Sequence, residues 1–539
     1  MKLTFEGLQD RECWEKAGIA LPGYSPQTLY DNARKQPVWL HFGIGNIFRI
    51  FIGSLADRLA ENGELNAGII CAESFDMEIV DRIYKPFDSL ELNVILHSSG
   101  TVDRKVTGVF GEALKADPAE KDFERLKEVF RSPSLQMVSF TITEKGYALK
   151  DENGNWYPFI RNDIEKGPET VHSVPAILAA MLRERFENGK TPLALVSMDN
   201  CSHNGETLRN AVLTIAKEWH KRGVITDEYM AWLSDEACVS FPWTMIDKIT
   251  PRPSEEIAAD LEQRGIENMR PVITARKTFI APFANAEGPQ YLVIEDSFPN
   301  GRPPLEDAGV YMTDRETVNK SERMKVTVCL NPVHTALCTY DCMLGYDLFA
   351  DGMSDPELLK LAKLLAYKEG MDVVEDPKIL SPAAFLDELF AERFPNRYLG
   401  DTSQRIAVDI SQMTAIRFGE TIRSYVKKYG TAKQLKAVPL AIAGWLRYLL
   451  ALDDEGKPFE LAPDPRGEEI RDYIQKNFRF GMQEAGDLLR PVLSNLNIFG
   501  SDLYEAGIGE TIEQMFLDQL QGPHAVRNTL RKYLDDITL

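Results

Sequence analysis

The chain lacks long apolar runs, paired cysteines and closely spaced histidines. No stretch approaches the roughly 18 apolar residues of a membrane span, and the charged N-terminal segment lacks the apolar core of a signal peptide. Its seven cysteines form no CxxC pair, so reduced thiols in a cytoplasmic protein are the simplest interpretation. None of the seven histidines falls at HxH or HExxH spacing, and we therefore expect no metal site.

Basic residues are outnumbered by acidic ones, 61 Lys and Arg against 82 Asp and Glu. The net charge of −21 argues against nucleic acid as a partner, because binding to phosphates needs a basic face. An anionic substrate would then need arginine or lysine placed locally in its pocket. We expect a small-molecule partner, with no nucleic acid and no membrane, and the composition leaves the oligomeric state open.

The pattern of apolar residues predicts two domains. With 539 residues, of which 44% are hydrophobic, the chain is globular and too long for one ordinary core. Strand-like runs alternate with helical patterns up to about residue 315, which predicts an α/β domain with a parallel sheet over residues 1–315. Helical patterns then dominate, which predicts an all-helical domain over residues 316–539. The expected strands are Val38–Ile44, Gly68–Ala72, Leu92–His97, Met137–Thr143 and Leu193–Met198. The expected helices are Ile50–Asn62, Glu120–Phe130, Val174–Glu187, Asp355–Lys368, Pro382–Phe394, Thr431–Leu452 and Val526–Leu534.

A glycine-containing turn follows the first expected strand. Gly43 and Gly45 would let the backbone turn tightly and approach a pyrophosphate at the start of a helix. The third glycine of a GxGxxG motif is missing, and Arg49 follows instead. We predict that Gly43, Gly45, Asn46 and Arg49 contact a dinucleotide, and a glycine turn without a ligand is the alternative.

Acidic residues end the second expected strand. Glu73 follows Ile69–Ala72 directly, and Asp76 lies close behind. A carboxylate here can accept both ribose hydroxyls of NAD and would repel the extra phosphate of NADP. We therefore predict NAD(H) as the cofactor, held by Glu73 or Asp76, and a solvated loop acid is the alternative.

The segment Ser321–His334 has the composition of a dehydrogenase active site. Within fourteen residues it contains a potential base, a potential proton relay and two neutral hydrogen-bond donors. This set suits the removal of a hydroxyl proton while a hydride leaves the same carbon.

Several segments carry a family resemblance in the same order along the chain. The run from Gly43 to Arg49 has a Gly-x-Gly-x-x-x-Arg form, and the active-site segment has Glu-x-x-Lys and then Asn-x-x-His. The other segments are Ser139–Tyr147, Ser197–Gly205, Phe241–Pro251, Ile294–Phe298 with Gly301–Pro303, and Arg393–Asn396. Together they resemble the mannitol dehydrogenase family of polyol-specific long-chain dehydrogenases, over residues 36 to 500. The resemblance implies a Rossmann-type domain followed by a helical domain.

The resemblance also implies roles for individual residues. Lys325 would be the general base, with a surface lysine as the alternative, and Glu322 would relay protons toward solvent. Asn331 and His334 would hold the substrate oxygen. Asn200 and Asp247 match positions that contact the substrate or hold the catalytic lysine.

One residue is inserted relative to the family pattern. Five residues, Val326 to Leu330, separate Lys325 from Asn331 where four are expected. At about 100° per residue, an uninterrupted helix would place Lys325 and His334 on opposite faces. We therefore predict a π-type turn, or a break at Asn331–Pro332, between them.

The chain length and two segments bear on the choice of substrate. The chain length and the Cys-Leu-Asn-Pro-x-His-Thr variant favour a sugar acid, with fructuronate reduced to mannonate, and mannitol or another neutral polyol is the alternative. Met413 stands where members acting on sugar acids would carry lysine, but Arg417 remains and could pair with a substrate carboxylate. A helix-surface ion pair is the other interpretation of Arg417. A non-catalytic dinucleotide-binding relic is the competing hypothesis for the whole chain.

Overall fold

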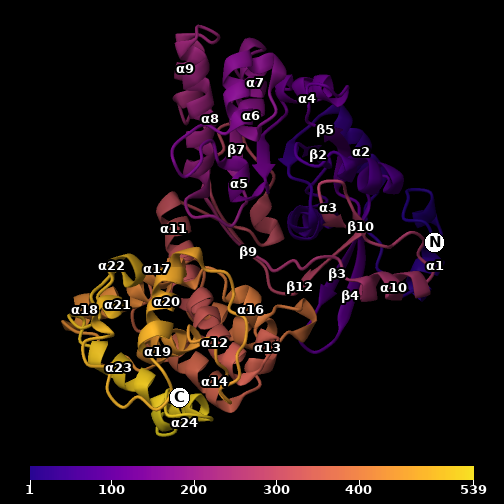
Figure 1. The fold of residues 1–539 in the computed structure, drawn as a ribbon. Helices are drawn as coiled ribbons and strands as arrows, with labels where there is room; N and C mark the ends of the chain where they lie inside the picture. Colours follow the sequence, from indigo (N-terminus) through magenta and orange to yellow (C-terminus); the bar gives the residue numbers. More distant parts are fainter. Residues whose placement is uncertain (539) are drawn as a thin grey trace. The chain divides into compact units, whose positions relative to one another are not determined.

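The computed structural model describes residues 1–538 and divides into two compact units (Figure 1). Unit 1 comprises Met1–Leu96 and Thr101–Asn319, and unit 2 comprises His97–Gly100 and the chain from Lys320 onward. Among the described residues, no helix is both long and apolar enough to cross a membrane.

Unit 1 is built on a six-stranded sheet in which every neighbouring pair is parallel. The strand order is β5-β2-β1-β6-β7-β8, the order of dinucleotide-binding folds. The predicted α/β class with a parallel sheet is confirmed. The strands are β1 (Trp39–Phe42), β2 (Ile69–Glu73), β5 (Phe110–Lys115), β6 (Met137–Phe140), β7 (Leu193–Ser197) and β8 (Val239–Ser240).

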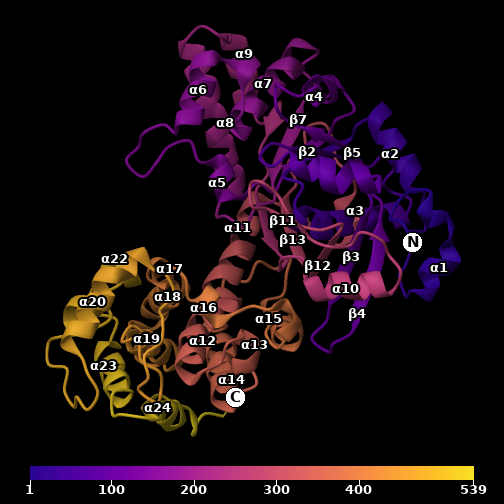
Figure 2. The same ribbon diagram turned by 45° about the vertical axis from the view of Figure 1, so that its right-hand side comes forward.

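Both faces of this sheet are covered, because side chains alternate along each strand. Leu40 and Phe42 pack into a core with helices α4, α7 and α8, whereas Trp39 packs into a second core with α3 (Figure 2). Helix α7 has the predicted bounds. The helices of unit 1 are α1 (Arg11–Lys16), α2 (Pro26–Lys35), α3 (Gly53–Glu61), α4 (Asp122–Arg131), α5 (Thr143–Tyr147), α6 (Pro158–Lys166), α7 (Val174–Glu187), α8 (Asn204–Lys221), α9 (Asp227–Ser234) and α10 (Glu255–Gln263). Shorter turns are η1 (Gly7–Gln9), η2 (Phe48–Ile52), η3 (Val80–Tyr84), η4 (Lys85–Phe87), η5 (Pro168–Thr170) and η6 (Leu305–Ala308).

One predicted strand belongs to a different sheet. The run Leu92–His97 forms β3 (Glu91–Leu96), which pairs antiparallel with β4 (Val102–Thr107) and parallel with β12 (Phe283–Glu287). Its inclusion in the parallel sheet was wrong, because β3 turns directly back into β4 and its other partner comes from far along the chain. The remaining strands are β9 (Thr244–Asp247), β10 (Val272–Ile273), β11 (Phe279–Ile280), β13 (Tyr291–Glu295) and β14 (Tyr311–Thr313).

Unit 2 is helical, as predicted, and within residues 320–538 the structure has no named strand. Capping residues define several helix starts: the side chain of Asp355 accepts the backbone N–H groups of Glu357 and Leu358, with Pro356 at the first helical position. The predicted helices Asp355–Lys368 and Pro382–Phe394 each begin as an α-helix and end as a π-helical turn. The expected helix Thr431–Leu452 is shorter, because its apolar pattern includes the turn before Ala437.

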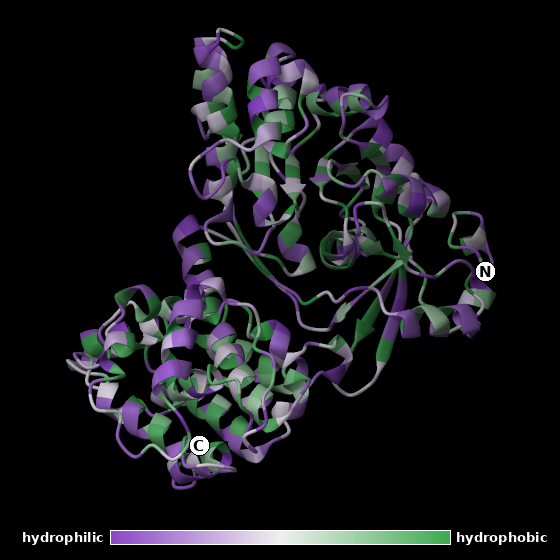
Figure 3. Cartoon of the chain, viewed as in Figure 1, coloured by the Kyte–Doolittle hydropathy of each residue, from purple (hydrophilic) through white to green (hydrophobic). Residues whose placement is uncertain are grey.

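The helices of unit 2 show alternating apolar and polar bands, as expected for packing around a shared core (Figure 3). The helix α11 (Arg315–Met324) leads into the unit. Its elements are then η7 (Lys325–Cys329), α12 (Asn331–Leu344), α13 (Phe349–Gly352), α14 (Pro356–Lys363), η8 (Leu364–Gly370), α15 (Pro382–Glu388), η9 (Leu389–Arg393), η10 (Arg397–Leu399), α16 (Ser403–Ile406), α17 (Ile410–Arg417), α18 (Gly419–Tyr429), α19 (Ala437–Tyr448), η11 (Pro465–Gly467), α20 (Glu468–Asn477), α21 (Arg490–Leu493), α22 (Leu496–Phe499), α23 (Gly509–Asp518) and α24 (Ala525–Leu534).

Candidate active site

The two glycines after β1, Gly43 and Gly45, are required for different structural reasons. Gly43 has φ +87°, and a Cβ there would lie 2.1 Å from the carbonyl oxygen of Thr141. Only glycine tolerates both conditions. A Cβ on Gly45 would meet nothing within 4 Å, so this position faces open space. Gly43 therefore makes the turn, and Gly45 leaves room for a ligand beside the helix that begins at Asn46.

Arg49 supports this turn from inside the protein. Its side chain is 1% exposed and its Nη1 donates to Glu91 Oε2 at 2.5 Å and to the carbonyl of Ala281 at 2.7 Å. Its Nη2 donates to Asn46 Oδ1 at 2.7 Å. Burial raises the pKa of Glu91 to about 7, although the guanidinium of Arg49 opposes the shift. Arg49 thus ties the start of the helix to β3, and Asn46 lies between Arg49 and the glycine turn.

Glu73 faces the glycine turn from the end of β2. Its Oε2 accepts the backbone N–H of Ile44 at 3.3 Å, and its Oε1 accepts those of Phe75 at 2.8 Å and Asp76 at 3.1 Å. Burial raises the pKa of Glu73, and the three N–H donors oppose this. The side chain of Asp76 instead accepts the hydroxyl of Thr274 at 2.5 Å. Of the two predicted acids, Glu73 is the one whose carboxylate contacts the turn.

The loop after β7 carries Asn200, and Asp247 ends β9. Asn200 is exposed, whereas Asp247 is buried. The two segments are joined by Asn204, whose Nδ2 donates to the carbonyl of Asp199 at 3.0 Å and to Thr244 Oγ1 at 2.8 Å. Asn204 was not predicted as a site residue, although it lies in the same family segment as Asn200. Its amide fixes the loop of Asn200 relative to β9.

The predicted catalytic segment contains the expected interruption. Lys325–Cys329 forms the π-helical turn η7, in which the N–H of Leu330 donates to the carbonyl of Lys325 at 3.0 Å. Regular α-helical bonding resumes where the N–H of His334 donates to the carbonyl of Leu330 at 3.2 Å. Pro332 lies in the first turn of α12, where its missing N–H costs no hydrogen bond. The prediction of a π-type turn between Lys325 and His334 is confirmed.

The side chains of this segment differ in burial. Lys325 is 3% exposed, and Glu322, one turn earlier on α11, is half-buried. Asn331 starts α12, and its Oδ1 is buried with no hydrogen-bond partner among the described residues. An amide oxygen left in this state costs free energy that a substrate hydroxyl would recover by donating to it.

His334 is held in an aromatic and cationic environment. Its ring lies 4.6 Å from that of Phe349 and 5.3 Å from that of Phe394. Burial lowers the pKa of His334 to about 3, and the positive charges of Arg393, Arg417 and Arg405 lower it further. The imidazole is therefore neutral at neutral pH and can donate a hydrogen bond without carrying charge.

Arg417 reaches the start of α12 from α17. Its Nη1 donates to Thr335 Oγ1 at 2.5 Å, and its Nε is buried with no hydrogen-bond partner among the described residues. Burial lowers the pKa of Arg417. Met413, one turn earlier on α17, is 36% exposed. Thr335 belongs to the His-Thr motif, but its contact with Arg417 was not predicted, because Arg417 lies 82 residues away along the chain.

The described residues contain no group of three or more His, Cys, Asp or Glu side chains placed to hold a metal ion. Unit 1 contains a glycine turn with the acid Glu73 beside it, and unit 2 contains a Lys-Asn-His segment. A two-domain dehydrogenase has both features.

Comparisons with known proteins agree with this class. The mannitol dehydrogenase Rossmann domain matches residues 38–306, and the mannitol dehydrogenase C-terminal domain matches residues 317–519. The chain belongs to the mannitol dehydrogenase family, which confirms the resemblance found in the sequence.

Individual relatives extend over nearly the whole chain. The chain is 48% identical over 536 residues to a D-mannonate oxidoreductase of Thermotoga maritima, covering 99% of both chains. Among solved structures, a D-sorbitol dehydrogenase in substrate-free form is similar with a TM-score of 0.76 and 26% identity, over 94% of this chain and 98% of that one. The Pseudomonas fluorescens mannitol 2-dehydrogenase shares the fold, with a TM-score of 0.71, 24% identity and full coverage of both chains.

Proposed function

We propose that this chain is an NAD(H)-dependent oxidoreductase that interconverts D-mannonate and D-fructuronate. Its main support is the 48% identity, over 99% of both chains, to a protein named for the mannonate reaction. The family includes dehydrogenases of neutral polyols, so the choice of a sugar acid needs separate support from the residues of the site.

The cofactor proposal is supported by the turn after β1. Gly45 faces open space at the start of a helix, where a pyrophosphate gains from backbone N–H groups and the helix dipole. Glu73 lies beside this turn and would accept the ribose hydroxyls, which favours NAD(H) over NADP(H). When bound, the nicotinamide accepts or supplies the hydride. Arg49 contributes by positioning Asn46 and the helix start, because it is itself buried in contacts with protein groups.

The proton chemistry falls to the segment around the π-turn. Lys325 takes the hydroxyl proton when mannonate is oxidised and returns it when fructuronate is reduced, and Glu322 relays that proton to solvent. Asn331 and neutral His334 hold the reacting oxygen and stabilise the charge that develops on it. Asn200 and Asp247 complete the set as substrate-contacting or lysine-holding residues.

The observation that carries the sugar-acid substrate is the guanidinium of Arg417 beside Thr335. It is largely desolvated, it makes no ion pair with a carboxylate among the described residues, and one of its donors lacks a partner. A substrate carboxylate would supply the missing charge and acceptor in a bidentate pair. The exposed Met413 gives no cation at the position where lysine was expected, so we assign this role to Arg417.

The test is a substrate panel with purified protein. NADH oxidation is followed with fructuronate, tagaturonate and fructose, and NAD reduction with mannonate and mannitol. Efficient turnover restricted to fructuronate and mannonate supports the proposal, whereas turnover of fructose and mannitol alone would assign a neutral-polyol dehydrogenase. We also propose that the enzyme works in the cytoplasm, where its seven unpaired cysteines would stay reduced.

A further inference from the structure

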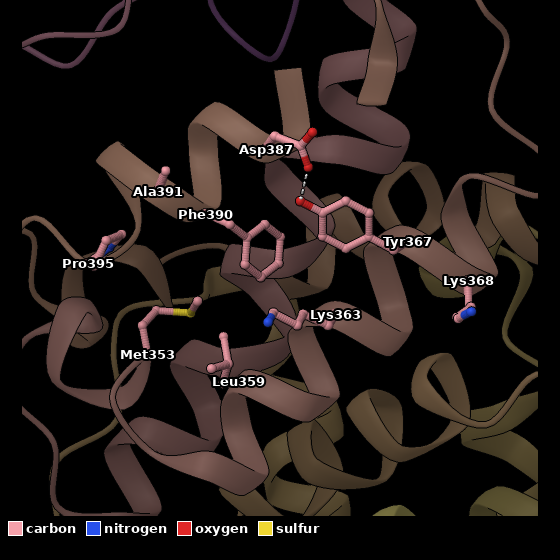
Figure 4. Close-up of a pocket in the computed structure, with 9 residues that line it drawn as sticks. All are labelled: Met353, Leu359, Lys363, Tyr367, Lys368, Asp387, Phe390, Ala391 and Pro395. Atoms are coloured by element: carbon pink, nitrogen blue, oxygen red, sulfur yellow. Dashed lines mark hydrogen bonds between the residues drawn. The ribbon is translucent and has the colours of Figure 1, made fainter. Parts of the chain in front are cut away.

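Unit 2 contains a cavity whose lining does not include the proposed catalytic residues. It is about 700 Å³ in volume and lies between two helices that both end in π-helical turns, α14 with η8 and α15 with η9. Volumes of this size are typical of sites for small molecules. Its lining residues are Met353, Leu359, Lys363, Tyr367, Lys368, Asp387, Phe390, Ala391 and Pro395 (Figure 4).

The lining is apolar around one cation. Met353, Leu359 and the ring of Phe390 surround the end of Lys363, as Figure 4 shows. Lys363 is half-buried and makes no ion pair or hydrogen bond within residues 1–538. An ammonium without a partner in a cavity favours an anion, and the apolar walls favour a ligand with a hydrocarbon body.

The other polar groups of the cavity are engaged or turned away. The hydroxyl of Tyr367 donates to the carboxylate of Asp387 at 2.9 Å, so these two groups pair with each other. Lys368 is exposed and lies to the side of the cavity in Figure 4. Lys363 is therefore the cation that a ligand would meet.

One intervening ring connects the wall of this cavity to His334. The ring of Phe390 lies 5.1 Å from that of Phe394, and the ring of Phe394 lies 5.3 Å from that of His334. A ligand that packs on Phe390 could thus affect the proposed catalytic residue His334 through the ring of Phe394, which packs against both.

We propose that this cavity binds a small organic carboxylate with an apolar body, and that its occupancy alters turnover at His334. The carboxylate would pair with the ammonium of Lys363, and the hydrocarbon part would pack on Leu359, Met353 and Phe390. The second half of this proposal rests on the proposed dehydrogenase function, and the binding itself does not.

Binding is tested by titrating the full-length protein with hexanoate in a calorimeter, without substrate or cofactor. Hexanamide serves as the uncharged probe of the same shape. We expect saturable hexanoate binding that is about tenfold weaker for hexanamide and for Lys363→Met, since a hydrogen-bonded charge is lost in both cases. The matched control is Lys360→Met on the same helix, whose ammonium bonds the carbonyl of Asp535 away from the cavity, and it should bind hexanoate normally.

Equal binding by Lys363→Met and the unchanged protein, or no saturable binding, would overturn the site. The effector role is tested by measuring kcat with hexanoate present, in the unchanged protein and in Phe390→Leu. We expect hexanoate to change kcat severalfold, with the change reduced in Phe390→Leu. Hexanoate binding with no effect on kcat would overturn the effector role. If no substrate is turned over at all, the proposed function fails while the calorimetric result still decides the binding site.

Discussion

The N–H of Leu330 donates to the carbonyl of Lys325 at 3.0 Å, five residues back along the chain, where a regular helix would bond four residues back. This bond absorbs the one residue by which the segment exceeds the family pattern. Nine regular steps of about 100° would turn His334 to the face opposite Lys325, and eight leave them within about 80° of each other. The π-turn thus explains how the Lys-Asn-His set can act on one substrate atom despite the insertion.

The first prediction concerns Lys325. The Lys325→Ala variant should lose about 10²- to 10⁴-fold in kcat, the usual contribution of a general base, while its affinity for NADH stays unchanged. Steady-state rates and a fluorescence titration of NADH measure the two quantities. Lys427→Ala, an exposed lysine of α18, is the control and should keep full activity. A Lys325→Ala enzyme that retains more than about a tenth of the rate would remove Lys325 from the mechanism.

Arg417 and Thr335 should affect recognition of the carboxylate. In Arg417→Met, the KM for fructuronate should rise about 10- to 100-fold, because hydrogen bonds to a charged group contribute about 1.5–3 kcal/mol. Any turnover of fructose, which has no carboxylate, should be little affected. Comparable losses with both substrates would show that Arg417 supports the fold rather than the carboxylate.

Thr335 is predicted to position Arg417. Thr335→Val keeps the shape of the side chain but removes the acceptor of the 2.5 Å bond, and should raise the KM for fructuronate by about three- to tenfold with kcat nearly unchanged. Thr335→Ser restores the hydroxyl and should restore the KM. A Thr335→Ser enzyme as impaired as Thr335→Val would contradict the positioning role.

Glu73 should set the cofactor preference. The unchanged protein should use NADH with a kcat/KM at least about tenfold above that for NADPH, and Glu73→Ser should narrow this ratio by removing the charge that repels the extra phosphate. Because Glu73 also accepts three backbone N–H groups, thermal unfolding should be measured alongside. Asp76→Asn is the comparison, and a larger change in cofactor ratio there would transfer the role to Asp76.

His334 should make folding stability depend on pH. Its pKa is lowered from 6.5 to about 3, so the unfolded chain binds the extra proton more readily between these values. Its contribution to stability is complete above pH 6.5 and is lost as the pH falls toward 3. Relative to His334→Asn, the unfolding free energy of the unchanged protein should fall as the pH is lowered through this window. The upper limit of this fall is about 1.4 kcal/mol per pH unit, and the partial solvation of the ring keeps the actual fall below that limit. The unfolding free energies of the two proteins are measured by urea unfolding at pH 7.5 and pH 5.5. An equal change in both proteins between these pH values would contradict the lowered pKa of His334.

The apolar patterns of short segments correctly predicted several strands and one helix of the fold. The strands that became β1, β2, β6 and β7, and helix α7, follow from short apolar runs, and the π-turn follows from counting residues between Lys325 and Asn331. Strand β5 was missed because Phe110–Lys115 includes a glycine and two charged residues. The sheet partner of β3 could not be foreseen, because the paired residues of β12 lie about 190 positions further along the sequence, as in Leu92 and Phe283.

In the candidate site, too, the residue types could be predicted from the sequence, but the contacts between distant segments could not. The residue types at Gly43, Glu73 and Lys325 indicated their chemistry, but their partners come from distant segments. Arg49 was expected to contact the cofactor, and its burial against Glu91, 42 residues away, depends on the tertiary fold. The contact between Arg417 and Thr335 likewise exists only once α17 packs on α12.

The proposed reaction is best decided by comparing kcat/KM for fructuronate and for fructose with NADH, using the unchanged protein and Arg417→Met together. We predict strong activity on fructuronate, at least about a hundredfold above that on fructose, and a loss of most of this preference in Arg417→Met. Efficient reduction of fructose with no activity on fructuronate would contradict the proposed substrate, and an absence of NADH oxidation with every sugar tested would contradict the dehydrogenase itself.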